Sequence, residues 1–227
     1  MDRRYRKNFN TLTENEQNII NKQRVLVIGA GGLGGYVLDF LSRIGVKKIK
    51  LVDFDNFDCT NLNRQLLSNE NNLGALKVLE GKKYIHSINS TVEIETFCKT
   101  FEECDFNDLF NGIDVVFDCC DSIKSKFNIE EQCQIFKIPL IYAAIGGLFG
   151  QVTCILPENP LLNKIYPNKN IIGIEKELGN LCFLVATASS IQVNLFIKLI
   201  LNKEIRTDGF YYIDMEAIDI DWISLTK

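Results

Sequence analysis

A glycine-rich turn close to the start of the chain limits its possible folds more than any other feature. The segment Gly29-Ala30-Gly31-Gly32-Leu33-Gly34-Gly35 directly follows the apolar run at residues 25–28. A short apolar run that ends in glycines is typical of a buried parallel strand, and residues 33–44 continue with helical spacing. Strand, turn and helix in this order predict the opening unit of a nucleotide-binding α/β sheet.

Strand-like and helix-like segments continue to alternate up to about residue 145. We expect further strands at residues 48–52, 91–97, 115–117 and 140–144, and helices at residues 75–87 and 122–137. Because strands that alternate with helices pair in parallel, this order predicts a doubly wound, Rossmann-like and mainly parallel sheet.

Two segments flank this core, which spans residues 24–145. In the N-terminal arm, residues 1–23, Thr13 and Glu16 have the spacing of a capping box and predict a helix that ends near Lys22. Residues 146–227 are expected to form a strand–helix–strand extension. It comprises a strand at 151–156, a loop-rich stretch at 157–178, a helix at 182–201 and a strand at 210–214. Without internal repeats, a single domain over residues 1–227 is the simplest interpretation.

The composition suits one compact, water-soluble domain. Of 227 residues, 46% are hydrophobic, and 25 basic against 29 acidic side chains give a net charge of −4. No basic run is long enough to follow a nucleic-acid backbone, and the polar start lacks the apolar core of a signal peptide. Polar residues such as Thr187 and Lys198 interrupt the apolar stretch at 181–201, which indicates a buried helix and not a membrane span. We therefore expect a cytoplasmic protein.

Eight cysteines raise the question of a metal or disulfide site. None forms a Cys-x-x-Cys pair, and His86 is the single histidine. Since structural zinc needs four clustered sulfur or nitrogen ligands, we predict no zinc site and interpret the cysteines as small core residues that stay reduced.

The glycine turn is the first part of a predicted nucleotide site. Glycine allows a phosphate to approach the backbone, and the start of the following helix offers free amide donors. Asp53 closes the second predicted strand, about 20 residues beyond the turn, where a carboxylate can accept hydrogen bonds from a ribose. A glycine turn without a ligand is the alternative, and the strand, helix and acid together favour a nucleotide.

The loop after this strand favours triphosphate chemistry over hydride transfer. It carries Asp55, Asn61, Arg64 and Gln65, and Lys77 lies in the first turn of the next predicted helix. Cleavage of a triphosphate requires cations that neutralise the phosphates as charge develops. Arg64 and Lys77 can supply them, although either one alone would be interpreted as a solvated surface charge.

Asp121 and Ser122 follow the predicted strand at residues 115–117. They lie at the carboxyl end of that strand, where open α/β sheets bind ligands. Asp121 could hold Mg²⁺, which prefers oxygen ligands, or it could cap the helix that follows. The residues alone leave both interpretations open.

Together these motifs resemble the ThiF/MoeB/HesA family, relatives of the ubiquitin-activating enzymes. The likeness covers nearly the whole chain and runs through Gly29-x-Gly31-Gly32-Leu33-Gly34, Asp53-x-Asp55, Asn61-Leu62-Asn63-Arg64-Gln65, Gly74-x-x-Lys77, Asp121, Gly150-Gln151-Val152-Thr153 and Gly179. The resemblance implies a homodimer that uses ATP and Mg²⁺. It also implies adenylation of the C-terminal glycine carboxylate of a small ubiquitin-like sulfur carrier ending in Gly-Gly, with release of pyrophosphate.

The resemblance assigns roles to individual residues. Arg64 and Lys77 would neutralise the phosphates and Asp121 would hold Mg²⁺, and these three form the predicted catalytic set. The predicted nucleotide-binding residues are Gly29, Gly31, Gly32, Gly34, Asp53, Asp55, Asn61, Arg64, Gln65, Lys77, Asp121, Ser122, Arg6 and Lys7.

Three features depart from the family pattern. The two Cys-x-x-Cys pairs that bind zinc in many members are absent, and no thiol stands shortly before Gly179, so adenylation is predicted without an essential thiol. Cys182 lies just past that glycine and is interpreted as a buried helix residue. The N-terminal Arg-Tyr-x-Arg motif, whose last arginine reaches the partner subunit's site, stands here as Arg4-Tyr5-Arg6-Lys7.

A non-catalytic scaffold that binds ubiquitin-like folds is disfavoured by the intact Arg64, Lys77 and Asp121. Two enzymatic alternatives stay open at this point. Adenylation of a carboxylate on a modified tRNA base is one, because Ser122 follows Asp121 and the zinc pairs are missing. An NAD-dependent oxidoreductase is the other, although His86 stands alone as a proton donor. Among sulfur carriers, the thiamine and the molybdopterin or tungstopterin types fit the resemblance equally.

Overall fold

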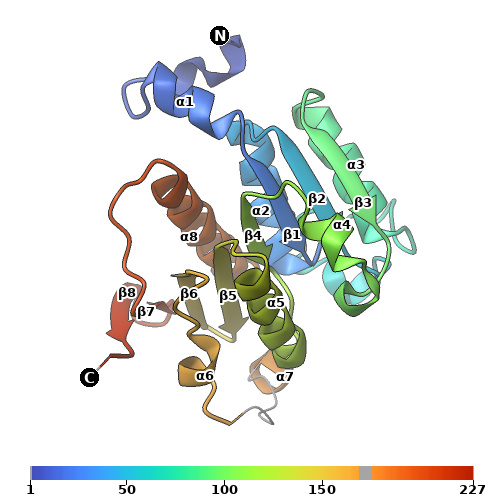
Figure 1. Cartoon of the computed structure of the whole chain (residues 1–227). Coiled ribbons are helices and arrows are strands. Elements are labelled where there is room, and N and C mark those ends of the chain that lie inside the picture. The colour runs from blue at the N-terminus through green and yellow to red at the C-terminus, as the bar shows by residue number, and fades with distance from the viewer. Residues whose placement is uncertain (1, 169–174, 227) are drawn as a thin grey trace.

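The computed structural model describes residues 2–168 and 175–226, which contain one eight-stranded sheet. The strands are β1 (Arg24–Ile28), β2 (Lys48–Val52), β3 (Glu93–Phe97), β4 (Val115–Asp118), β5 (Leu140–Gly146), β6 (Phe149–Ile155), β7 (Gly209–Asp214) and β8 (Asp219–Ser224). Their spatial order is β3-β2-β1-β4-β5-β6-β7-β8 (Figure 1). Neighbours from β3 to β5 are parallel and those from β5 to β8 are antiparallel.

Helices cover both faces of the sheet. They are α1 (Glu14–Ile20), α2 (Gly32–Ile44), α3 (Lys77–Ile88), α4 (Phe106–Phe110), α5 (Ile123–Ile135), α6 (Leu162–Ile165), α7 (Glu175–Leu178) and α8 (Cys182–Ile200). Side chains of α2, α3 and α8 enter one hydrophobic cluster, and those of α4, α5 and α6 enter a second cluster on the opposite face. The ribbon shows α5 on one side of the sheet and α2 and α8 on the other (Figure 1). The predicted doubly wound, Rossmann-like sheet is confirmed.

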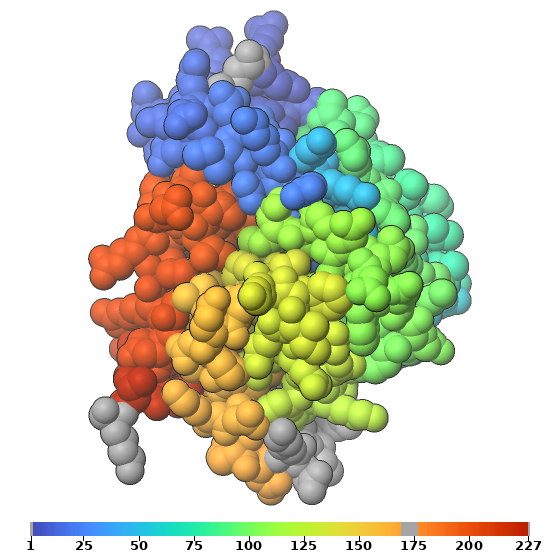
Figure 2. All heavy atoms as spheres, viewed as in Figure 1, coloured from blue at the N-terminus to red at the C-terminus, as the bar shows by residue number. Residues whose placement is uncertain are grey.

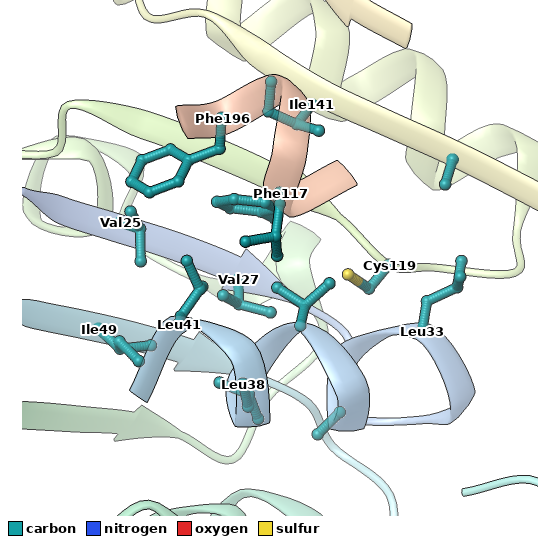
Figure 3. Close-up of a cluster of buried hydrophobic side chains, with 14 of the residues drawn as sticks. Val25, Val27, Leu33, Leu38, Leu41, Ile49, Phe117, Cys119, Ile141 and Phe196 are labelled. Atoms are coloured by element: carbon teal, nitrogen blue, oxygen red, sulfur yellow. The ribbon is translucent and has the colours of Figure 1, made fainter. Parts of the chain in front are cut away.

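The core between α2 and the parallel strands explains why β1 reads as a continuous apolar run. Val25 and Val27 of β1 face Leu38 and Leu41 of α2, and all four are buried (Figure 3). The other face of β1 is equally covered, so its alternate residues are also apolar. Burying each such side chain contributes about 1.5–3 kcal/mol, and this holds the start of α2 at the end of β1.

Helix α8 is a core helix in this structure. It is long and apolar enough to pass a length and composition test for a membrane span. Its Leu184 and Phe196 are nevertheless fully buried, and the Phe196 ring lies 5.5 Å from that of Phe117 on β4 (Figure 3). The predicted buried helix is therefore confirmed, with one correction: Cys182, its first residue, is exposed.

The local signals at the N-terminus work as predicted. The hydroxyl of Thr13 accepts a hydrogen bond from the Glu16 amide, and the Glu16 carboxylate accepts one from the Thr13 amide. This capping box starts α1, which ends at Ile20 with Asn21 as its C-cap. Glu16 also forms an ion pair with Lys203, beyond the end of α8, at 2.9 Å.

Several expectations about the second half of the chain need correction. The extension is not strand–helix–strand alone, because β8 follows β7 as an edge strand. Helix α4 was not expected, and α5 begins at Ile123 and ends at Ile135, inside the predicted range of 122–137. The stretch predicted to be loop-rich contains α6 and α7, while residues 169–174 lie outside the described residues.

Candidate active site

A cavity of about 930 Å³ lies at the carboxyl ends of the parallel strands. Its wall is built from the glycine turn after β1, the loops after β2 and β4, and the junction of β5 and β6. This is the edge where open α/β sheets bind ligands, and the volume suits a nucleotide together with part of a second substrate.

Two positions of the glycine turn have no room for a side chain. Gly29 adopts a φ of +98°, and a Cβ on Gly34 would lie 1.9 Å from the Gly29 carbonyl oxygen. Gly31 caps α2 without any side-chain hydrogen bond, so the first amides of this 13-residue helix face the cavity unblocked. Free amides and the positive end of the helix dipole fit phosphate groups, as predicted for a nucleotide.

Asp53 lies beside this turn at the end of β2. One of its carboxylate oxygens accepts a hydrogen bond from the Ala30 amide at 2.6 Å, and the other accepts one from the Asp55 amide at 2.8 Å. Burial raises the pKa of Asp53, while these two amide donors oppose the shift. Each oxygen keeps a further lone pair at the cavity wall, which suits ribose hydroxyls.

The two predicted cations have different surroundings. Lys77, the first residue of α3, is almost fully buried and forms an ion pair with Asp55 at 3.0 Å. The Arg64 guanidinium donates to the Thr60 carbonyl at 3.0 Å and to the Asn63 side chain at 2.9 Å. Within the described residues Arg64 has no ion pair, so its charge remains available for a phosphate.

Gln65 and Asn61 lie in the same loop and differ in orientation. Gln65 lines the cavity beside Gly31, and its buried Oε1 atom has no hydrogen-bond partner among the described residues. Asn61 does not line the cavity; its Oδ1 accepts a hydrogen bond from the Asp58 amide at 3.1 Å. The structure thus gives Asn61 a part in shaping the loop, and its predicted contact with nucleotide stays a prediction.

The sequence left open whether Asp121 caps the following helix or holds a metal ion. Ser122 is the N-cap of α5, because its hydroxyl accepts the Ser125 amide at 3.4 Å, and so Asp121 is not the cap. The Asp121 side chain is exposed at the cavity wall, where it suits a cation with oxygen ligands. Across residues 2–168 and 175–226, no three His, Cys, Asp or Glu side chains cluster as metal ligands, so any Mg²⁺ would need further oxygens from phosphate and water.

A buried ion pair at the cavity floor was missed by the sequence reasoning. Lys126 of α5 lies 3.0 Å from the Asp118 carboxylate and donates to the Ala143 carbonyl at 2.7 Å. Burial lowers the pKa of Lys126, but the charge and hydrogen bond of Asp118 together with the nearby Tyr166 and Cys120 outweigh burial, so the net shift of that pKa is upward. The available signal was a lysine one turn into the helix that follows an aspartate-ended strand, a position that faces the sheet.

Arg6 and Lys7 lie far from the cavity of their own chain. Their neighbour Tyr5 packs against Gly45 at the C-terminal end of α2, whereas the cavity is at the other end of that helix. The N-terminal arm accordingly projects at the end of the molecule opposite α6 (Figures 1 and 2). A contact of Arg6 or Lys7 with nucleotide therefore requires a second copy of the chain.

The ThiF family model matches residues 3–225 of this chain. The chain belongs to the ThiF family. It is 30% identical over 205 residues to a molybdopterin-synthase adenylyltransferase of Haemophilus influenzae, covering 86% of this chain and 84% of that one. It is 28% identical over 196 residues to a SAMP-activating enzyme E1 of Haloferax volcanii, covering 85% and 73%. A third relative, the adenylyltransferase and sulfurtransferase MOCS3 of Anopheles gambiae, is 30% identical, but only 43% of its length is matched.

A solved structure supports the fold assignment. The crystal structure of E. coli MccB with ATP superposes with a TM-score of 0.78 at 20% identity, covering 100% of this chain and 73% of that one. The family match and the curated relatives identify this ThiF protein as an adenylyltransferase of the ThiF/MoeB type. Its glycine turn, free helix start and Asp53 fit the ATP that such an enzyme uses.

Proposed function

We propose that this ThiF protein uses ATP and Mg²⁺ to adenylate the C-terminal glycine carboxylate of a small ubiquitin-like sulfur carrier. The observation that carries the proposal is a single cavity that continues from Asp53 and the glycine turn to Gln151 on β6. Such a cavity has room for ATP at one end and a carboxylate-bearing chain at the other. The relatives named for molybdopterin synthase and for SAMP support this class of substrate, and favour the molybdopterin type over the thiamine type.

In the proposed reaction, a carboxylate oxygen of the carrier attacks the α-phosphorus of ATP. The bond between the α-phosphorus and the oxygen that bridges it to the β-phosphate breaks, and pyrophosphate leaves with that electron pair. Arg64 neutralises the developing charge, and Lys77, held beside the cavity by Asp55, supplies a second cation. Asp121 would hold Mg²⁺, and the metal would offset further phosphate charge.

We also propose that the enzyme works as a homodimer in the cytoplasm. A second copy would allow Arg6 or Lys7 to approach the cavity, which neither reaches within its own chain. All eight cysteines are free, as expected in a reducing compartment. Mixing a chain that carries Arg6→Ala and Lys7→Ala with an Arg64→Ala chain should restore exchange in mixed dimers, because each dimer then regains one complete site.

An ATP–pyrophosphate exchange assay tests the main proposal. A ubiquitin-like carrier ending in Gly-Gly should stimulate exchange, and intact-mass analysis should show one AMP per carrier. A carrier without its final glycine is the matched control, because its carboxylate is displaced by one residue, about 3.3–3.6 Å, and should give neither signal. Stimulation by tRNA and by no carrier would overturn the proposal in favour of the tRNA-base reaction, and tight binding of NADH without exchange would favour an oxidoreductase.

A further inference from the structure

Two buried side-chain oxygens mark the end of the cavity away from Asp53. Within the described residues, Gln151 Oε1 and Asn180 Oδ1 are buried without a hydrogen-bond partner, and both residues line the cavity. An unpaired buried acceptor is costly. Gln65 Oε1, beside the glycine turn, is a third such atom in the cavity lining, and Gln151 and Asn180 are the two near the junction of β5 and β6. Their pairing by a ligand that donates hydrogen bonds would remove this cost.

The order of the strands, taken with the proposed reaction, indicates which substrate reaches them. Along the sheet edge, Asp53 follows β2, the glycine turn follows β1, Asp121 lies beyond β4, and Gln151 belongs to β6. In the proposed reaction the ribose lies at Asp53 and the phosphates at the glycine turn. The acyl substrate therefore enters from the β5–β6 side, where Gln151 and Asn180 are.

Both oxygens are held by surrounding structure. Gln151 is paired in register with Ala144 on β5 and Tyr212 on β7. Asn180 forms a parallel bridge with Gly147, and its own carbonyl accepts a hydrogen bond from the Asn63 side chain at 3.3 Å. Gln151 is thus held by its two neighbouring strands, and Asn180 is held by its bridge to Gly147 and its contact with Asn63.

An aromatic wall stands beside Gln151. The rings of Phe149 and Tyr212 stack at 6.0 Å with an interplanar angle of 11°, and both residues line the cavity. Phe149 and Gln151 point to the same face of β6 because side chains alternate along a strand. A flat aromatic wall can pack against an extended chain of residues without side chains.

A peptide N–H is the donor that the proposed acyl substrate brings to this end of the cavity. Phosphate oxygens and the attacking carboxylate are acceptors only, so neither can pair with the amide oxygens of Gln151 and Asn180. The backbone of an extended chain of glycines carries N–H donors and has no side chains that would prevent close approach. On the basis of the proposed function, we infer that Gln151 and Asn180 form a backbone-amide subsite. It accepts hydrogen bonds from the last N–H groups of the carrier tail and positions the terminal carboxylate at the α-phosphate.

Substitution of the two acceptors tests this subsite. In Gln151→Leu and Asn180→Leu, the KM for a Gly-Gly carrier in the exchange assay should rise about 3- to 10-fold per lost hydrogen bond, with a smaller change in kcat. Gln132→Leu on α5, outside the cavity lining, is the matched control and should keep the wild-type KM. The dissociation constant for ATP is measured in parallel, and a change as large as that in the carrier KM would overturn the proposal, because it would indicate general damage to the cavity.

Carriers made with N-methylglycine at the last or penultimate position supply the second measurement. N-methylation removes one N–H donor, so it should raise the wild-type KM but add little in the variant that has lost the matching acceptor. An equal N-methyl effect in wild type and both leucine variants would overturn the subsite alone. No carrier-stimulated exchange in the wild type would overturn the proposed function, and the subsite with it.

Discussion

The parallel and antiparallel halves of the sheet contribute different chemical groups to the cavity wall. In the parallel half, β1 and β4 are covered on both faces, and the nucleotide site is made largely of backbone: a glycine turn and the free amides of α2. In the antiparallel half, every residue of β8 is exposed or half-buried, and the cavity wall is made of side chains from β6 and β7. The backbone part of the cavity is therefore encoded by residues close together in the sequence. The side-chain part forms only when strands that are distant in the sequence pair.

This contrast suits the two proposed substrates. ATP offers the same phosphates to every enzyme, and a rigid backbone cradle inside a doubly covered core fits them. A protein carrier varies in its surface, and a one-sided antiparallel sheet can expose many different side chains to it. If the two halves are as separate in stability and in catalysis as they are in construction, substitutions in one half should leave the other half unaffected.

The largest effect is expected at the boundary, where Lys126 pairs with Asp118. Lys126→Met leaves a fully buried carboxylate without its cation, which should lower the free energy of unfolding by about 3–5 kcal/mol. At about 2–4 °C per kcal/mol for a chain of this size, Tm should fall by about 6–20 °C. Urea and thermal unfolding measure both quantities.

Two further variants sharpen this prediction. Lys124→Met removes an exposed lysine from the same helix and should leave Tm almost unchanged. Adding Asp118→Asn to Lys126→Met should recover part of the loss, because the unpaired charge is then gone. A Lys126→Met protein as stable as the wild type would show that the pair contributes nothing at this boundary.

The next effect concerns catalysis in the parallel half. Arg64→Ala and Asp121→Ala should each lower the exchange rate by about 10²–10³-fold, because in the proposed reaction both groups act on charge that develops in the transition state. The KM for the carrier should change little, in contrast to the leucine variants of Gln151 and Asn180. Lys83→Ala on the surface of α3 is the control. Retention of most of the exchange rate in either alanine variant would refute these roles.

The sequence predicted the parallel half well because its signals are local. The glycine turn, the apolar run of β1 and the Asp53 position all lie within about 30 residues, and short-range periodicity and spacing describe them. The placement of Lys77 in the first turn of a helix and the capping box at Thr13 were predicted for the same reason, although the helix begins at Lys77 and not at residue 75. Only the pairing of Lys77 with Asp55 needed the tertiary structure.

The antiparallel half and the cavity floor were less predictable because their contacts are distant in sequence. Gln151 faces Tyr212 across 61 residues, and the sequence gives no sign that its oxygen lacks a partner. The edge strand β8 alternates aspartate with apolar residues and was left unassigned, since half-exposed edge strands lack a strong apolar run. The burial of Lys126 depends on how α5 meets β4 and β5.

A smaller effect should be confined to the antiparallel end. Trp222 of β8 packs edge-on against Tyr211 at 4.9 Å, and the Arg206 guanidinium lies 5.6 Å from the Trp222 ring. Trp222→Ala should cost about 1–2 kcal/mol of stability through these contacts. Hydrogen exchange should quicken in β7 and β8 and stay unchanged in β1 and β4. Ile223→Ala, on the other face of β8, is the control; quicker exchange throughout the sheet would show that the halves open together.

The smallest effect is expected at an ion pair that ties the N-terminal arm to the segment after α8. The Thr13 amide and the Lys203 ammonium both donate to the Glu16 carboxylate and lower its pKa to about 2. A carboxyl group whose pKa is lower in the folded state stabilises the fold above its unfolded pKa, about 4.5, and loses that contribution as the pH falls toward 2. Glu16→Gln should therefore lower Tm slightly at pH 7, and the difference from the wild type should shrink between pH 5 and pH 2. Glu14→Gln, in the first turn of the same helix, should show no such closing difference. Thermal unfolding at five pH values measures this difference in Tm. A difference that does not depend on pH would mean that Glu16→Gln disturbs α1 by something other than loss of the carboxylate charge.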